Sequence, residues 1–298
     1  MLAALALGAS AQTPATVRLA VTYTPDSWLL YSASIHTDVV THIGQGSDLH
    51  ATLTTEAEAQ LHVQPGATTN NFSVEARFIR YTTTLTADNA QQKAELEKQA
   101  AATDQAAVSM APARFRVAEG HFNIVFRQPG AAYDQAVDML SELARTDDLP
   151  SGAVAVGAAW SRTRSRAIPE TTIAMPLTLH CTLTGLGRED GLATATIAVH
   201  ASSGVNLPPG SLPGSQQMAS EGLVPLGKFS FNTQAQATYR VADGILLETH
   251  SETHSNMNIQ FIGPSPQALT SESEIHSIGT VKLEKILKVP GHSPFIRP

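Results

Sequence analysis

The sequence predicts a mainly β protein whose long, curved antiparallel strands form two related halves of a half-barrel or open barrel. Three observations support this fold class. Long stretches alternate apolar and polar residues, one pattern of strands occurs twice along the chain, and only two helical segments interrupt the strands. Alternation with a period of two is the pattern of a strand with one buried face, so we expect one sheet with one or two covering helices.

The clearest hairpin lies between residues 229 and 262. Phe229, Phe231, Ala235, Ala237 and Tyr239 alternate with polar residues, "ADG" follows, and a second alternating stretch runs from Ile245 to Ile262. A turn over residues 242–244 would pair Val241 with Ile245, with Gly244 in the left-handed conformation. The same register sets Gln236 opposite His250, Gln234 opposite Glu252 and Asn232 opposite His254.

A shared pattern predicts an internal duplication. The stretch "ARFRVAEGHFNIVF" resembles "ATYRVADGILLET", and each half has one of the two tryptophans, Trp28 or Trp160, near its start. We therefore divide the chain into residues 12–148 (first half, with two helices), 149–290 (second half) and a tail at 291–298. The alternative is convergence, because hairpin turn chemistry recurs by itself.

The remaining elements follow from capping and periodicity. Asp88 is the expected N-cap of a loosely packed surface helix over residues 89–110. A second helix follows Pro129-Gly130, and its apolar stripe of Tyr133, Val137, Leu140 and Ala144 requires burial against the sheet. Residues 204–227 are rich in Gly, Pro and Ser and predict a loop. A last strand is expected at about residues 274–287.

Composition narrows the classes of function. The chain has 298 residues, 42% of them apolar and only 15% charged, with a net charge of −7. This charge argues against nucleic acid as a partner. The one basic cluster, Arg162, Arg164 and Arg166, is interpreted as a solvated strand face. Cys181 is the only cysteine, in the apolar phase of its strand, so we expect a buried and inert thiol.

The N-terminus indicates export. Residues 1–11 form a short apolar run that ends in the small-x-small pattern Ala9-Ser10-Ala11, which is typical of a secretory signal peptide. A positively charged start is missing, and an ordinary apolar N-terminus is the alternative. No later stretch has the roughly 20 apolar residues of a membrane span. We expect a periplasmic or secreted bacterial protein.

A short motif supports the same setting. Leu149-Pro150 precedes an apolar strand with Val154, then Gly157 and Trp160. In these features and in its two halves, the chain resembles an exported bacterial family of unknown function, although Ala158-Ala159 replaces the polar pair expected before the tryptophan. The architecture is also similar to the half-barrels of periplasmic lipoprotein carriers. The second resemblance implies binding of a hydrophobic ligand or a partner; neither implies catalytic residues.

The apolar face of the 229–262 hairpin is the first candidate site. Small residues occupy its middle, and larger ones flank them at one end. Because well-filled cores use larger side chains, this face leaves room for a bend, a covering helix or a ligand cavity. The candidate ligand-binding residues are Phe229, Phe231, Ala235, Ala237, Thr249, Ser251, Thr253 and Met257.

The polar face of the same hairpin is the alternative site. His250, Glu252 and His254 alternate along one strand, where a rise of about 3.3 Å per residue puts the two histidines roughly 13 Å apart, too far to share an ion. The adjacent pairs, His250 with Glu252 or Glu252 with His254, are about 6.6 Å apart and could bridge a metal by leaning together. If the C-terminal strand is the neighbour, His254, His276 and Glu274 could converge on a metal. An ordinary solvated face is the simpler interpretation.

The sequence favours a non-catalytic role. GxSxG, GxxxxGK[ST] and GxGxxG motifs are absent. We expect no catalytic residue and no cofactor, and a hydrophobic small molecule or an envelope protein as the partner. The alternatives are a metal-dependent hydrolase or metal-binding protein that uses the histidine strand, and a structural envelope protein.

Overall fold

The computed structural model describes residues 16–44, 46, 48–65, 71–118, 121–126, 131–144, 149–168, 171, 173–212, 215–220, 222–263 and 269–288. The predicted signal peptide, the 291–298 tail and the Pro129-Gly130 pair lie outside these residues.

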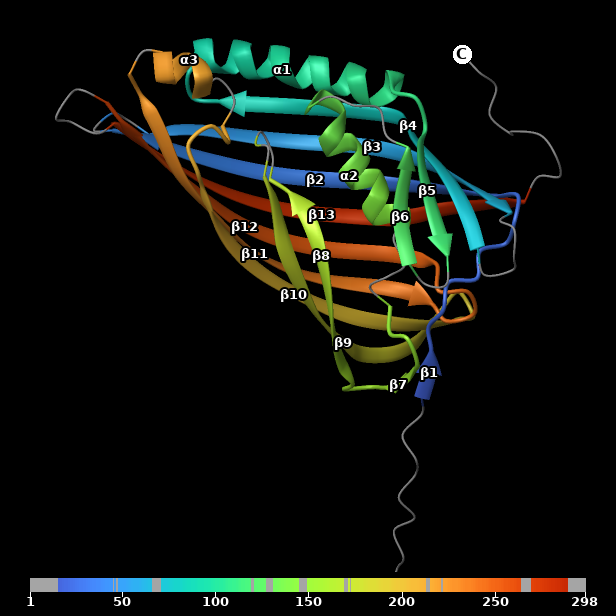
Figure 1. Ribbon diagram of the computed structural model, residues 1–298. Helices are drawn as coiled ribbons and strands as arrows, with labels where there is room; N and C mark the ends of the chain where they lie inside the picture. The colour runs from blue at the N-terminus through green and yellow to red at the C-terminus, as the bar shows by residue number, and fades with distance from the viewer. Residues whose placement is uncertain are drawn as a thin grey trace, which may run out of the picture.

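Strands dominate the fold (Figure 1). The first half contains β1 (Thr16–Arg18), β2 (Ser27–Ile43), β3 (Leu49–Pro65), β4 (Asn71–Ala87), α1 (Ala90–Ser109), β5 (Ala113–Ala118), β6 (His121–Phe126) and α2 (Ala131–Ala144). The second half contains β7 (Ala153–Ala155), β8 (Ala159–Ala167), β9 (Ala174–Glu189), β10 (Leu192–Leu207), α3 (Ser215–Ser220), β11 (Val224–Arg240), β12 (Leu246–Ile262) and β13 (Leu269–Lys288).

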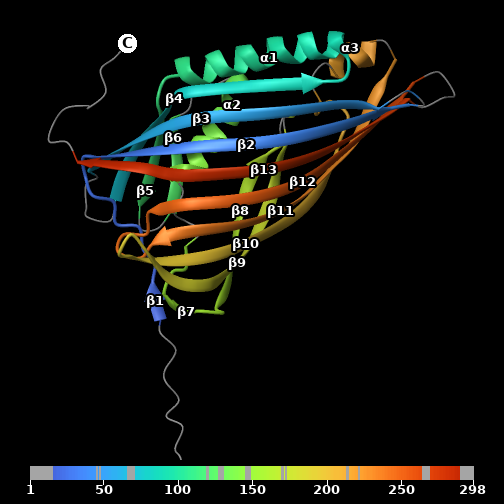
Figure 2. The same cartoon turned by 180° about the vertical axis from the view of Figure 1, so that it is seen from behind.

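Eleven strands form one antiparallel sheet in the order β6-β5-β4-β3-β2-β13-β12-β11-β10-β9-β8. The last strand, β13, lies between β2 and β12 and joins the two halves. The sheet curves so that β5, β6, β8 and α2 lie in front of the central strands in Figure 1, and Figure 2 shows the outer side. β6 and β8 remain its edges, which confirms the predicted open half-barrel.

The β11–β12 hairpin has the predicted register. Gln236 lies opposite His250, Gln234 opposite Glu252 and Asn232 opposite His254. The turn differs in detail, because the Arg240 N–H donates to the carbonyl of Ile245 and the loop is one residue longer at its start. A bulge after Thr238 compensates for the difference.

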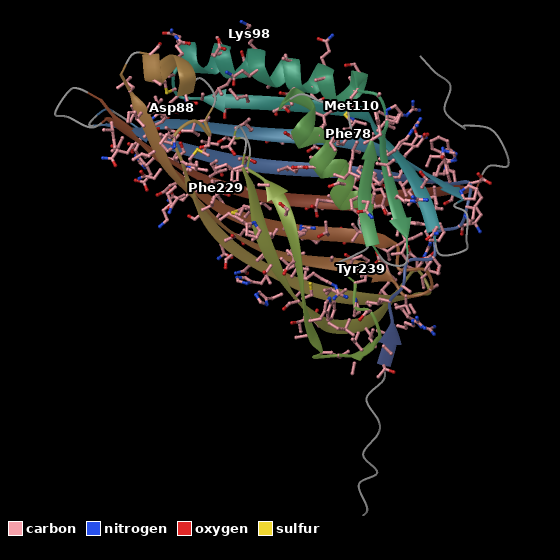
Figure 3. The ribbon with its side chains drawn as sticks, viewed as in Figure 1. Phe78, Asp88, Lys98, Met110, Phe229 and Tyr239 are labelled. Carbon is pink, nitrogen blue, oxygen red and sulfur yellow. The ribbon has the colours of Figure 1, made fainter. Side chains whose placement is uncertain are left out.

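Two hydrophobic cores lie on the inner side of the sheet. The first lies between β2–β5 and the helices and includes Phe78 and Met110; the second lies under β8–β11 and includes Phe229, with Tyr239 packed against it (Figure 3). The N-terminal segment connects them, since Leu19 lies in the second core and Tyr23 in the first. The proposed duplication stays a prediction.

Helices α1 and α2 pack on the first core. α1 follows β4, largely exposed, and Asn89 rather than Asp88 caps it: the Asn89 side chain accepts hydrogen bonds from the backbone N–H groups of Gln91 and Gln92. α2 buries Val137, Leu140 and Ala144 in the first core, as predicted. Tyr133 is placed only by its backbone. Among the described helices, none has the length and apolar character needed to cross a membrane.

Two further predictions are wrong. The first is the loop expected over residues 204–227. Residues 204–207 continue β10 and residues 224–227 begin β11, because Gly204 and Gly227 are both paired in the ladder between these strands. Helix α3 occupies part of the remaining segment. Arg162 and Arg164 also lie in the same phase as buried Leu179 and Leu177 rather than on a solvated face.

The two arginines instead bridge neighbouring elements. The Arg162 guanidinium donates to the carbonyl of Leu149 at 3.0 Å, and Arg164 pairs with Glu142 of α2 at 3.0 Å. The side chain of Arg166 is not among those described.

Candidate functional site

The inner face of the central strands carries no charge. In β2, β3, β11, β12 and β13, odd-numbered residues pair with odd-numbered residues throughout the central ladder. At these positions residues 29–43, 49–65, 225–239, 249–261 and 269–283 contain no Asp, Glu, Lys, Arg or His. The charged residues of the same segments lie at even positions on the outer face. These five strands therefore separate a charge-free inner face from a charged outer one.

Part of this inner face lies outside both cores. We call it the open strip: the odd-numbered residues from Ile35 to Thr41 of β2, Ser273 to Gly279 of β13 and Ser251 to Met257 of β12. These residues form cross-strand rows, for example Val39–Ile275–Ser255. All are half-buried, and only Met257 packs against a core. At about 3.3 Å per residue, the strip is about 20 Å long.

Hydroxyl groups on and beside the open strip bond to one another. Thr37 and Ser277 lie 3.0 Å apart between their hydroxyl oxygens, and Thr41 and Ser273 3.1 Å apart. At the border with β11, the hydroxyls of Thr233 and Thr253 lie 2.9 Å apart. Paired hydroxyls leave fewer unsatisfied polar groups, so the methyl groups of the threonines and the side chains of Val39 and Ile275 define a weakly polar surface.

The predicted ligand-binding residues fall into two groups. Phe229, Phe231 and Ala237 are buried, and the two phenylalanines belong to the second core. The others, Ala235, Thr249, Ser251, Thr253 and Met257, are half-buried on or beside the open strip. The expected helical cover of this region is not α2, which packs its apolar stripe into the first core. Sequence reasoning missed the β2 and β13 residues of the strip, which the alternation within each strand could have indicated.

The outer face brings three of the predicted metal ligands together. His254 of β12 lies directly opposite His276 of β13, and their rings stack with centroids 4.3 Å apart. The Nε2 atoms of His254 and His276 lie 3.1 Å and 3.0 Å from Oε1 of Glu252. Hydrogen bonds from His276 and then His254 lower the pKa of the Glu252 carboxyl. One ligand atom from each residue lies within 4.8 Å of the other two.

The other two candidates lie outside this cluster. Glu274 pairs with Asn256, two residues along β13 from His276, and Glu252 rather than Glu274 joins the two histidines. His250 contacts Glu248 at 3.3 Å and the Thr280 hydroxyl at 3.2 Å instead. Elsewhere, His180 and His200 face each other on β9 and β10 and are exposed, and Cys181 is buried, as predicted.

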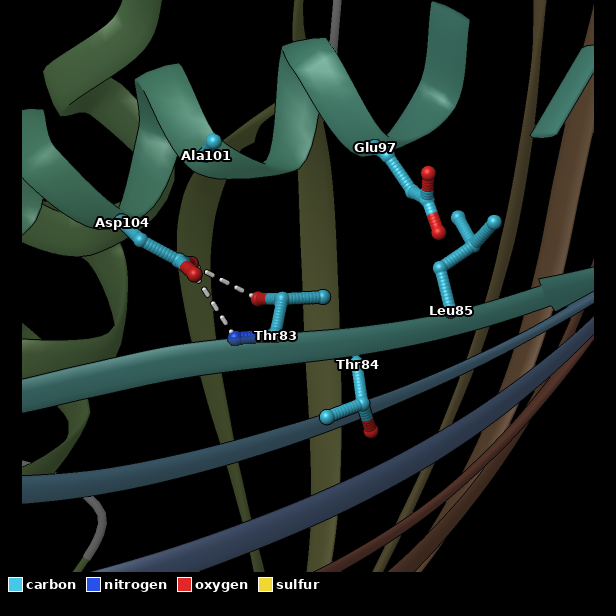
Figure 4. A pocket seen from close by; sticks show the side chains of 6 residues that line it. All are labelled: Thr83, Thr84, Leu85, Glu97, Ala101 and Asp104. Carbon is cyan, nitrogen blue, oxygen red and sulfur yellow. Dashed lines mark hydrogen bonds between the residues drawn. The ribbon is translucent and has the colours of Figure 1, made fainter. Parts of the chain in front are cut away.

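A hollow of about 440 Å³ lies between α1 and β4 (Figure 4). It is lined by Thr83, Thr84, Leu85, Glu97, Ala101 and Asp104. The Asp104 carboxylate accepts hydrogen bonds from the backbone N–H and the hydroxyl of Thr83, both at 2.8 Å. Because these bonds fasten α1 to the free edge of β4, we assign Asp104 a structural role.

Comparison with known proteins gives little guidance. Neither a protein-family model nor a curated protein matches the chain, so the resemblance to an exported family finds no support there. A structure of lipid–protein interactions in lipovitellin has a TM-score of 0.43 and 13% identity; the match covers 92% of this chain and 26% of that chain. An outer-membrane channel from Pseudomonas putida F1 has a TM-score of 0.19 and 11% identity, over 90% and 97% of the two chains. We draw no conclusion from either likeness.

Proposed function

We propose that this is an exported, non-catalytic protein that binds a hydrophobic small molecule, such as a lipid acyl chain, on the concave face of its sheet. The observation that carries the proposal is the open strip: a charge-free, half-buried surface that neither core covers. The export component rests on the N-terminal sequence pattern.

The dimensions and chemistry of the strip favour a lipid over a protein partner. Half of a bilayer's hydrocarbon core, the length of one acyl chain, is about 15 Å, which fits within about 20 Å of strip. The hydroxyl pairs Thr37–Ser277 and Thr41–Ser273 bond to each other and do not require a polar ligand. A concave surface also encloses a narrow molecule better than a second globular surface.

Two substitutions on adjacent residues test the proposal. Val39 faces Ile275 on the inner side, whereas Val40 lies opposite Glu274 on the outer side. Val39→Lys introduces a charge where the ligand would lie and should weaken binding of a fluorescent fatty acid by at least about tenfold, equivalent to about 1.4 kcal/mol. Val40→Lys puts the same charge beside a carboxylate and should leave binding unchanged.

Fluorescence titration of the full chain measures both effects, and thermal unfolding checks that each variant folds. Native mass spectrometry of the purified protein should also detect a lipid-sized mass. Equal affinities for the two variants, or no binding of the fatty acid by the unmodified chain, would contradict the proposal.

A further inference from the structure

We propose that Glu252, His254 and His276 form a binding site for one divalent transition-metal ion of the zinc class on the outer face of the sheet. The site lies on the opposite face from the open strip and does not depend on the proposed ligand. Two imidazole nitrogens and one carboxylate oxygen are a donor set that zinc accepts, with water in the fourth position.

The distances between donor atoms are close to those that an ion requires. At metal–ligand distances of about 2.0–2.1 Å, tetrahedral donors lie roughly 3.3 Å from one another. Oε1 of Glu252 lies 3.1 Å and 3.0 Å from the Nε2 atoms of His254 and His276. All three donor atoms lie within 4.8 Å of one another, so small side-chain rotations suffice to surround an ion.

The backbone holds these residues in a fixed arrangement. β12 and β13 pair without interruption from Glu248–Lys282 to Phe261–Leu269, and the cluster lies near the middle of this ladder. His254 and His276 are a direct cross-strand pair, and their rings lie within 10° of parallel. Donors on adjacent paired strands need less ordering on binding than donors on loops.

The surroundings favour a cation. The remaining cross-strand partners of the three residues are the uncharged Asn232, Gln234 and Ile278, and Asp38, which lies opposite His276 on β2. Glu274, two residues from His276 on the same face of β13, adds a second nearby carboxylate. The side chains of Glu252, His254 and His276 are 53%, 62% and 36% exposed, which leaves an entry path for a hydrated ion. The chain's net charge of −7 acts in the same direction.

The neighbouring histidine provides a matched control. His250 lies on the same face of β12, four residues from His254, and is comparably exposed at 59%. Its partners are Glu248 and Thr280, so it contributes no donor to the cluster. A general affinity of surface histidines for metal would involve His250 as much as His254, whereas a defined site would not.

The experiment is calorimetric titration of the metal-stripped full chain with Zn²⁺. We expect one ion per chain. His254→Gln and His276→Gln should each weaken binding by at least about tenfold, since even changes to residues around a metal's ligands cost about that much. Glu252→Gln should also weaken it, while His250→Gln should match the unmodified protein. NMR of the imidazole groups should show Zn²⁺-induced shifts at His254 and His276.

Three outcomes would overturn the proposal: no saturable Zn²⁺ binding by the unmodified chain, binding unaffected by His254→Gln and His276→Gln, or an equal loss in His250→Gln. Circular dichroism verifies that each variant is folded. Fatty-acid binding, measured in the same samples, tests the inner face alone. Its result therefore neither supports nor contradicts the metal site.

Discussion

Gly244 packs against the N-terminal segment that connects the two cores. It lies in the β11–β12 turn with φ of 66°, and a Cβ there would approach the backbone of Ala20 and Val21 to 2.9 Å. The adjacent Asp243 carbonyl accepts a hydrogen bond from Thr22 N–H. Gly244→Ala should therefore lower the free energy of unfolding by more than about 2 kcal/mol, from left-handed strain and displacement of the N-terminal segment. Urea denaturation measures this change.

Gly191 provides the control for that substitution. Its φ of 80° is also positive, but a Cβ there meets nothing within 4 Å. Gly191→Ala should lower the free energy of unfolding by only about 1 kcal/mol, the cost of placing alanine in the left-handed conformation. Equal losses in the two variants would mean that the close approach of Gly244 to residues 20 and 21 adds no stability.

The pKa of His42, on the outer face of the sheet, is raised by its surroundings. The main cause is a hydrogen bond with Asp48 at 2.6 Å, which raises the pKa of His42 above its usual value. The charges of Glu274 and Glu272 raise it further, by smaller amounts. The protonated form is therefore the stabilised one: its contribution is present below the ordinary pKa and is lost as pH rises through the raised pKa. NMR titration should show the raised pKa, and Asp48→Asn should lower it; an unchanged pKa would exclude Asp48 as the cause.

At the scale of elements, one carboxylate adds hydrogen bonds to the apolar packing that holds α1 on the sheet. Within β4, only residues 71–76 pair with β5. Farther along β4, the Asp104 carboxylate accepts hydrogen bonds from the backbone N–H and the hydroxyl of Thr83 (Figure 4). Asp104→Ala should destabilise the protein by about 1–3 kcal/mol, because hydrogen bonds to a charged group are lost, and should accelerate hydrogen exchange at the Thr83 amide.

Lys98 on the same helix is exposed (Figure 3), so Lys98→Ala should change stability by no more than about 0.5 kcal/mol and leave Thr83 exchange unaltered. If Asp104→Ala behaved like Lys98→Ala, α1 would be held by apolar contacts such as Ala107 alone.

Local patterns predicted the elements better than their partners. The register of β11 and β12 followed from alternation and one glycine turn, because a slip of one residue would expose the whole buried face. The sequence could not choose between Asp88 and Asn89 as the cap, since both side chains suit that position. The inward Arg162 and Arg164 were missed because their partners, the Leu149 carbonyl and Glu142, come from other elements.

The same reasoning explains the partial prediction of the histidine cluster. The alternation placed His254 and His276 on outer faces, and the structure pairs them directly. Which carboxylate joins them depends on the register: Glu274 lies two residues along β13 from His276, whereas the Glu252 side chain reaches His276 from the neighbouring strand. A sequence pattern without the β12–β13 register cannot make that choice.

At the scale of the whole molecule, the first and last described strands pair with segments far from them in the sequence. β13 comes last in the chain and enters the sheet between β2 and β12, and β1 pairs with β7 of the second half. The described residues 16–144 are thus paired with residues 149–288 through both β1 and β13, and these pairings join residues far apart in sequence. Such long-range pairing predicts slow folding, because loop closure precedes the stabilising contacts.

Removal of β13 should accordingly disrupt the entire protein. A chain that ends at Gly263 lacks β13 and leaves β2 and β12 with unpaired edges over nearly their full lengths. Because long unpaired strand edges associate with other chains, we expect this truncated protein to aggregate or to lose cooperative unfolding. A chain that ends at Lys288 keeps β13 whole and should remain monodisperse. Size-exclusion chromatography and thermal unfolding distinguish the two, and a folded, monodisperse chain without β13 would show that each half is stable without the strand between them.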